Sequence, residues 1–158
     1  MIAAMLRTIV IVVVVAGCGG NKATTDAAID ATSCPADYTL VGNAHYKLLG
    51  TLEYGDAKTM CAADQQHIMV VDSASEATDV IIFLAMPSLN PWAGVEGIGN
   101  NMFQTALGVP ATYLPWDVDE PSTSAAGSCA VVEGSGLAAG SYFMDDCTMM
   151  RTALCECD

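Results

Sequence analysis

Cysteine content constrains the fold of this 158-residue chain more than any other feature. The first of its seven cysteines, Cys18, ends an apolar N-terminal stretch, and the other six lie in the rest of the chain. These six are Cys34, Cys61, Cys129, Cys147, Cys155 and Cys157. In an exported chain an even number predicts three disulfides, for which counting alone permits about 15 connectivities. A structural zinc site is the weaker interpretation, because no C-x-x-C pair and no histidine beside a cysteine is present.

The first 17 residues have the pattern of an export signal. Arg7 supplies the positive charge, Ile9 to Val15 form an apolar run too short to span a bilayer, and small residues follow. The sequence V-A-G-C at residues 15–18 resembles a bacterial lipobox, which implies cleavage before Cys18 and lipidation of Cys18. Ordinary secretion with cleavage nearby is the alternative. We therefore expect an extracytoplasmic, lipid-anchored protein of the bacterial cell envelope, at the outer membrane or cell surface.

Composition after the signal divides the chain into a tether and one domain. Residues 18–33 are rich in small and polar residues and contain one aliphatic side chain, Ile29, so they predict a flexible tether after the lipidated cysteine. Residues 34–158 are long enough for a single domain. Without the signal, four basic residues stand against 18 acidic ones, a formal charge of −14. This charge argues against nucleic acid and suits cations, basic partners or neutral ligands, although it also simply keeps a surface protein soluble.

Hydrophobic periodicity predicts an α+β fold, with two helices followed by a half made of strands and loops. Residues 38–52 alternate as one or two short strands, and the run from Glu53 has helical spacing that turns Cys61 inward. Met69 to Val71 suit a buried strand or an extended link. Ser73 and Glu76 form a capping box at the start of a second helix that stops before Pro87. After Pro91 we expect short strands and long loops, with a turn at residues 134–140.

Acidic residues cluster in the segment from Trp116 to Cys147. Asp117, Asp119 and Glu120 precede Pro121 and Ser122, and Asp145 and Asp146 stand beside Cys147. If Cys129 bonds Cys147, both acidic groups are drawn to one end of the domain. Converging carboxylates of this kind are what a hard cation or a polar ligand requires.

Six short segments, taken in order, resemble the C-type lectin-like domain. They are Cys34-Pro35 with Tyr38, Ala57 to Cys61, Trp92-Ala-Gly-Val95, Trp116 with Glu120-Pro121, Phe143-Met-Asp145-Asp-Cys147 and Leu154-Cys155-Glu156. Together they span residues 34–158. The resemblance implies a disulfide-bonded C-type lectin-like fold with two helices, small antiparallel sheets and a long loop region.

The same resemblance implies the disulfide pairs and one backbone feature. It pairs Cys61 with Cys155 and Cys129 with Cys147. Cys34 and Cys157 remain and are expected to join the two ends, which departs from the family's longer form. The resemblance also implies a cis bond before Pro121.

In this family a calcium ion held by carboxylates and amides binds sugar hydroxyls. Carried over, Glu120 and Asp145 keep two metal ligands, whereas Ser122, Gly127 and Met144 stand where the family has other ligands. Since calcium takes about six to eight oxygens, the resemblance implies a degenerate calcium site. The expected ligand-binding residues are Trp116, Asp117, Asp119, Glu120, Pro121, Ser122, Asp145 and Asp146. No cofactor other than Ca²⁺ is indicated. Both tryptophans are expected more as core residues than as sugar platforms.

Two functions follow from these features. The first is recognition of a carbohydrate or glycan-bearing surface, and the second is calcium-independent protein–protein adhesion on the same scaffold. A hydrolase that uses Asp119 and Asp145 is a weaker alternative, because the sequence contains no nucleophile motif or phosphate-binding loop. The prediction is therefore a binding module and not an enzyme.

Overall fold

The computed structural model describes residues 34–84, 89–135 and 138–158. The predicted signal peptide (1–17), the lipidated Cys18 and the tether (18–33) lie outside the described residues, as does Pro87. Within the described ranges no helix combines the length and apolar character that a membrane crossing requires.

The described residues of the domain form two helices and eight strands. In chain order they are β1 (Thr39–Val41), β2 (Ala44–Leu52), α1 (Tyr54–Ala63), β3 (His67–Ile68), α2 (Ala74–Leu84), β4 (Trp92–Gly99), β5 (Met102–Thr105), β6 (Ser128–Val132), β7 (Tyr142–Asp146) and β8 (Arg151–Cys157). The α+β class and the expected order of helices and strands are confirmed.

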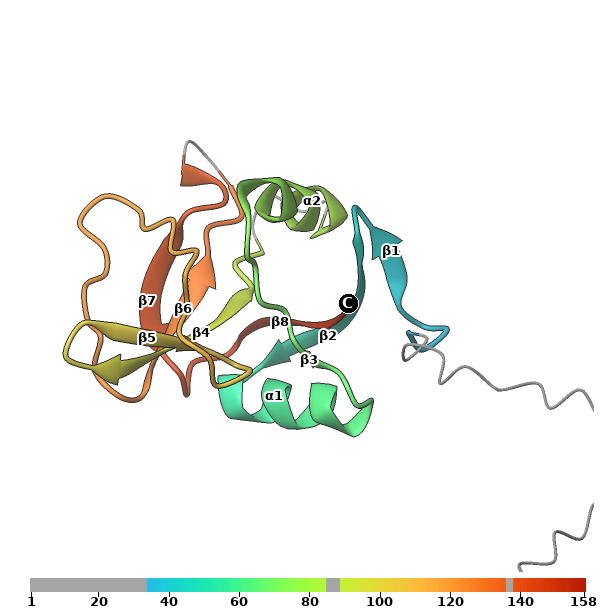
Figure 1. Ribbon diagram of the computed structural model, residues 1–158, viewed down its shortest axis with the longest axis horizontal. Coiled ribbons are helices and arrows are strands. Elements are labelled where there is room, and N and C mark those ends of the chain that lie inside the picture. The colour runs from blue at the N-terminus through green and yellow to red at the C-terminus, as the bar shows by residue number, and fades with distance from the viewer. Residues whose placement is uncertain (1–33, 85–88, 136–137) are drawn as a thin grey trace, which may run out of the picture. The chain divides into compact units, whose positions relative to one another are not determined.

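The strands form two four-stranded sheets whose paired strands are all antiparallel. One has the order β1-β2-β8-β3, so the last strand lies between the second and third strands of the chain. The other has the order β5-β4-β6-β7. Figure 1 shows α1 and α2 on opposite sides of the β2–β8 strands, with the second sheet beside them and the long loop between β5 and β6 at its outer end.

The first helix is fixed by a buried stripe and by a disulfide. Tyr54, Ala57 and Cys61 recur at spacings of three and four and are buried, as the periodicity predicts. Tyr54 packs edge-on against Trp92, with ring centroids 5.6 Å apart. The indole Nε1 of Trp92 donates to the carbonyl of Leu52 at 2.9 Å, so this tryptophan is a core residue.

The second helix begins with a cap that differs from the predicted capping box in one bond. The backbone N–H of Glu76 donates to the Ser73 hydroxyl at 3.3 Å, as expected. The Glu76 carboxylate accepts from the N–H of Asp72 instead of Ser73, at 2.8 Å. Its other oxygen accepts from the Tyr46 hydroxyl at 2.8 Å, so the side chain is drawn toward β2.

For residues 69–71 the sequence predicted either a buried strand or an extended link, and the structure shows the extended link. The β3 strand covers only His67 and Ile68, and Met69 to Val71 continue beyond it. Met69 and Val71 are nevertheless buried in the cluster beneath α2. The N–H of Met69 still donates to Leu154, which keeps the link against β8.

Within the ranges that the structure describes, three disulfides join elements that are distant in sequence. The pairs are Cys34–Cys157, Cys61–Cys155 and Cys129–Cys147, the same pairs that were expected. The first two attach the start of the domain and α1 to β8. The third ties the start of β6 to the residue after β7, so it fixes one end of the second sheet.

Candidate functional site

Residues 116–122 lie beside β7. Trp116 forms a parallel bridge with Tyr142. The N–H of Asp117 donates to the Tyr142 carbonyl at 2.9 Å, and the N–H of Tyr142 donates to Pro115 at 2.8 Å. We call residues 116–122 together with 143–146 the rim. Because β7 carries Asp145 and Asp146, both predicted acidic groups belong to this one surface.

Glu120 connects the loop at residues 116–122 to strand β7. Its Oε2 accepts from the N–H of Ser122 at 2.7 Å, the Ser122 hydroxyl at 3.0 Å and the N–H of Met144 at 3.0 Å. The bond between Glu120 and Pro121 is cis. This carboxylate is therefore satisfied by three protein donors around one oxygen.

Asp145 is held by a cation from its own chain. Its Oδ2 accepts from Arg151 Nε at 2.8 Å and also from Arg151 Nη2, and the two side chains are about three-quarters buried or more. The guanidinium lies over the Phe143 ring, 5.5 Å from its centroid. Arg151 thus supplies the positive charge that a metal supplies in a calcium site.

Asp146 is exposed and stabilises the turn after β7. It accepts from the N–H and the hydroxyl of Thr148, at 2.9 and 2.8 Å. These bonds to the charged form, the backbone one first, lower the pKa of Asp146 below its ordinary value. Asp117 and Asp119 also lie at the surface, and Asp119 has a positive φ of 66°. Among the described residues no hydrogen bond connects either carboxylate to Glu120 or Asp145.

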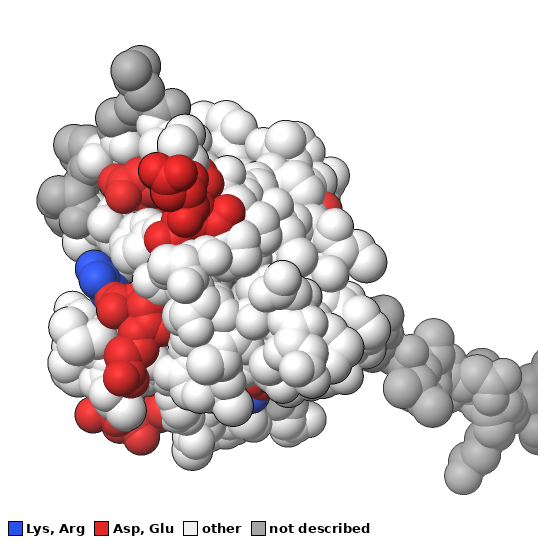
Figure 2. All heavy atoms as spheres, turned by 90° about the vertical axis from the view of Figure 1, so that its left-hand side faces the viewer, with Lys and Arg blue, Asp and Glu red and all other residues white. Residues whose placement is uncertain are grey.

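Trp116, the first residue of the rim, belongs to an aromatic cluster. Its ring centroid lies 4.9 Å from that of Phe103 and 6.0 Å from that of Tyr142. It also lines an open cavity of about 370 Å³ with Tyr113, whose lining residues carry no charge. Asp145 and Asp146 line another open cavity, of about 330 Å³. On the face of the molecule that Figure 2 shows, acidic side chains gather in groups and basic side chains are few.

The residues of the rim do not fit a calcium ion. One oxygen of Glu120 already has three donors, and one oxygen of Asp145 is occupied by a guanidinium. Calcium requires about six to eight oxygens, and Met144 and Gly127 contribute no ligating side chain. Glu120 and Asp145, the positions at which the resemblance implies metal ligands, are therefore bonded to protein groups.

Sequence reasoning missed a second acidic cluster, at the junction of β2, β3, β8 and α2. His67, Glu156 and Asp158 place one ligating atom each within 4.8 Å of one another, a spacing at which they could hold a cation. Glu156 is only 2% exposed, and its Oε2 accepts from the N–H of Val70 at 2.8 Å. The cluster joins residues that are far apart in the sequence. In the sequence analysis Glu156 was noted only as part of the Leu154-Cys155-Glu156 segment.

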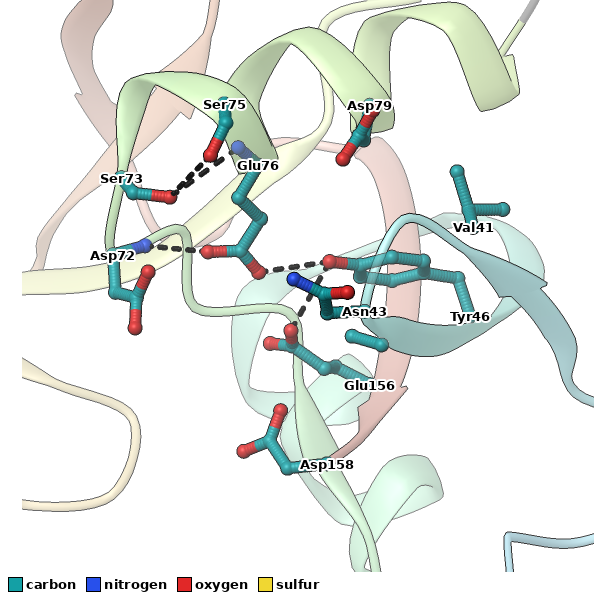
Figure 3. Close-up of a pocket in the computed structure, with 11 residues that line it drawn as sticks. Val41, Asn43, Tyr46, Asp72, Ser73, Ser75, Glu76, Asp79, Glu156 and Asp158 are labelled. Atoms are coloured by element: carbon teal, nitrogen blue, oxygen red, sulfur yellow. Dashed lines mark hydrogen bonds between the residues drawn. The ribbon is translucent and has the colours of Figure 1, made fainter.

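Glu156 and Glu76 converge on a single hydroxyl. Tyr46 Oη lies 2.8 Å from Glu76 Oε1 and 3.1 Å from Glu156 Oε1 (Figure 3). Since a hydroxyl carries one hydrogen, it satisfies one carboxylate at a time. Burial, and then the neighbouring Glu76, raises the pKa of Glu156 to about 9. Burial beside these carboxylates also raises the pKa of Tyr46.

With this architecture, the domain has the C-type lectin-like fold, and solved structures of that fold superimpose on it. The mouse scavenger receptor C-type lectin carbohydrate-recognition domain matches with a TM-score of 0.67 at 20% identity, over 79% of this chain and 96% of that one. The SPL-1–GlcNAc complex matches with a TM-score of 0.67 at 16% identity, over 81% and 97%.

A calcium-independent type II antifreeze protein matches with a TM-score of 0.65 at 16% identity, over 79% of this chain and 94% of that one. The fold is therefore shared by domains that differ in ligand and in their need for calcium. No protein-family model and no curated protein sequence matches this chain.

Proposed function

We propose that this protein is a lipid-anchored binding module of the bacterial cell envelope that recognises a carbohydrate or glycan-bearing surface through its rim without calcium. The V-A-G-C sequence at residues 15–18 supports the anchor and the extracytoplasmic location. The likeness to a carbohydrate-recognition domain and to a complex with GlcNAc supports the ligand class.

One observation carries the calcium-independent part of the proposal. Glu120 and Asp145, the two retained positions of the calcium site, are satisfied by Met144 N–H and by the Arg151 guanidinium. The loop conformation therefore does not depend on a bound ion. Sugar hydroxyls are left to donate directly to rim oxygens such as those of the Asp117 carboxylate and the Ser122 hydroxyl, whose own hydrogen is donated to Glu120.

A glycan array probed with and without chelator tests this function. We expect hits whose intensity is the same in both conditions. The Ser122→Ala variant weakens them at least threefold, whereas Thr59→Ala, which removes a hydroxyl from α1, leaves them unchanged. An empty array, or hits that vanish with chelator, contradicts the proposal.

A second candidate is calcium-independent protein–protein adhesion, favoured by exposed apolar residues in the rim and in the turn after β7. Val118 is 83% exposed at the centre of the loop, and Met149 and Met150 are about half exposed after β7. Binding to a target surface that survives glycosidase treatment but is lost after protease treatment and in Val118→Asp favours this candidate over the first.

The lipid anchor is tested separately. We expect mass spectrometry of the mature protein to find an acylated N-terminal Cys18, and Cys18→Ser to move the protein from the detergent phase to the aqueous phase. Unmodified Cys18 in the mature chain contradicts the anchor. We do not propose catalysis, because the weaker hydrolase hypothesis needs a free Asp145, and Arg151 holds that carboxylate.

A further inference from the structure

The open cavity that Trp116 and Tyr113 line is uncharged, although the chain as a whole has a formal charge of −13. We call it the Trp116 cavity. Its volume of about 370 Å³ lies within the range of about 300–1,000 Å³ that is usual for small-molecule sites. The described residues that line it come from α2, from the segment 113–116 and from residues 139–141, and none of them carries a charge.

Small side chains on α2 leave this space open. Ala74, Ala77 and Thr78 line the cavity and, with Ile81, lie on one face of the helix at spacings of three and four. Gly140 lines the cavity as well. A Cβ added to Gly140 lies 3.4 Å from Ile81 Cδ1 and 3.7 Å from Ala77 Cβ, so any side chain there narrows the space.

The aromatic wall of the cavity is fixed from behind. The rings of Tyr113 and Trp116 both stand nearly perpendicular to the ring of Tyr142, at centroid distances of 6.3 and 6.0 Å. Tyr142 is fully buried, and its hydroxyl donates to the carbonyl of Val71 at 3.3 Å. A wall that is already ordered in this way lowers the entropic cost of binding a ligand.

Two hydroxyls at the cavity have their hydrogens engaged by the protein. Thr78 Oγ1 donates to the carbonyl of Ala74 at 2.9 Å, and Ser141 Oγ donates to the carbonyl of Ala138. A hydroxyl oxygen that donates its hydrogen still accepts through its lone pairs. The cavity therefore suits a ligand that donates hydrogen bonds and also presents an apolar face to the aromatic rings.

The absence of charge in the lining decides against a charged ligand. A carboxylate or an ammonium that enters the cavity loses water and gains no counter-charge. The acidic surface of the chain repels acidic ligands in addition. A neutral pyranose meets these conditions, because its C–H groups pack against an aromatic ring while the hydroxyls at its edge donate hydrogen bonds.

We propose that the Trp116 cavity is a subsite that selects a neutral sugar of the glycan ligand. The pyranose ring packs against Tyr113 and Trp116, and its hydroxyls donate to Thr78 and Ser141. This inference rests on the proposed glycan recognition and extends it, because Trp116 belongs both to the rim and to the cavity. Sugars that carry a carboxylate or an ammonium are excluded from the subsite.

NMR titration of the full chain with methyl glycosides tests the ligand class. The probes are those of glucose, galactose, mannose and N-acetylglucosamine, each compared in mildly acidic buffer with a charged counterpart, the uronic acid for the three hexoses and glucosamine for the fourth. We expect at least one neutral glycoside to give saturable shifts of the amides of Ala77 and Gly140, with a dissociation constant in the millimolar range. No saturable shift with any neutral glycoside, or equal binding of its charged counterpart, overturns the proposal.

Two variants locate the sugar, each with a matched control on α1. Thr78→Val weakens binding about threefold or more, because one acceptor is lost, whereas Thr59→Val removes a hydroxyl bonded in the same way to Gly55 and leaves binding unchanged. Ala74→Leu fills the cavity from an exposed position and removes saturable binding, whereas Ala62→Leu adds the same side chain at an exposed position of α1 without effect. Unchanged affinity in both cavity variants overturns the location.

The glycan array separates failure of the subsite from failure of glycan recognition. Hits that keep their full intensity in Ala74→Leu leave recognition at the rim in place and overturn the cavity subsite. Hits confined to glycans built of acidic sugars also overturn the subsite alone. An empty array contradicts glycan recognition itself, and the subsite with it.

Discussion

Arg151 supplies the positive charge that pairs with the Asp145 carboxylate in the rim. It reaches Asp145 from the first residue of β8, and its guanidinium covers Phe143. An arginine that makes two bonds to one carboxylate is not replaceable by a neutral side chain of similar length, because a partly buried charge then loses its partner.

We predict that Arg151→Gln lowers the free energy of unfolding by about 1–3 kcal/mol, since Asp145 stays partly buried without a counter-charge. Lys58→Gln, which breaks the more exposed pair with Glu96, lowers it by less than about 1 kcal/mol. Urea unfolding measures both. Equal losses in the two variants contradict a special role for Arg151.

Glu156 gives the domain a pH dependence of defined sign. Because the folded pKa of about 9 lies above the ordinary value of 4.5, the folded state binds the proton more tightly than the unfolded state. Stability is then greatest below about pH 4.5 for this group and falls as pH rises toward about 9, by at most about 1.4 kcal/mol per pH unit.

The Glu156→Gln variant is predicted to lose this slope and to be at least as stable as the natural chain at pH 8. The amide donates to Tyr46 or Glu76 without a titrating proton and still accepts from Val70. Urea unfolding at a series of pH values measures the slope. A slope that persists in Glu156→Gln assigns it to another group.

At the level of single residues, sequence reasoning found Glu120 and Asp145 but not their partners. Both belong to short motifs, and motif spacing is visible in a sequence. Arg151 and Tyr46 act through contacts that only the fold creates. The cluster of His67, Glu156 and Asp158 was missed for the same reason, since only the fold brings the β3 residue beside the end of β8.

Among the elements, β4 depends on a glycine that no other residue replaces. Gly94 has a φ of 62°, and a Cβ added there lies 2.1 Å from the carbonyl oxygen of Met69. The close approach lets the link at residues 69–71 pack against the second sheet. The W-A-G-V segment therefore reflects a backbone contact between the two halves of the domain.

We predict that Gly94→Ala destabilises the domain by more than about 2 kcal/mol, through steric overlap with backbone and a left-handed φ. Gly55→Ala serves as the control, because nothing lies within 4 Å of its added Cβ. It lies in α1 and is expected to gain about 0.5–1 kcal/mol. Thermal or urea unfolding separates the two, and a tolerated Gly94→Ala contradicts the contact.

Periodicity predicted the helices well, because α1 and α2 bury residues at spacings of three and four. Sequence reasoning failed where a tertiary contact determines the hydrogen-bond partners of a residue. Glu76 was expected to complete a local cap, but the buried Tyr46 hydroxyl and the N–H of Asp72 offered better partners. Residues 69–71 are as buried as a strand yet pair too little to form one.

For the whole molecule, the two disulfides that end on β8 are nested, and the nesting changes how much each bond adds to the free energy of unfolding. Cys61–Cys155 already ties α1 to β8, so Cys34–Cys157 closes only the additional loop of roughly 30 residues between the two bonds. In the chain-entropy model that loop corresponds to about 3.5 kcal/mol, against about 5 kcal/mol for the full separation of 123 residues.

We predict that replacing Cys34 and Cys157 by alanine lowers the free energy of unfolding by about 3–4 kcal/mol when Cys61–Cys155 is intact. In a variant that lacks Cys61–Cys155 from the start, the same replacement costs more, because the loop is then longer. Urea unfolding of the four chains forms a cycle. Equal losses in both backgrounds contradict the nesting.

Cys34 is the first described residue of the domain, and its bond to Cys157 has a mechanical consequence. Tension applied to the chain ahead of Cys34 passes through a covalent link into β8, which sits between β2 and β3, so the pull does not unzip the edge strand β1. A domain tethered at this end and loaded at its far surface resists force along a path of sulfur bridges and central strands.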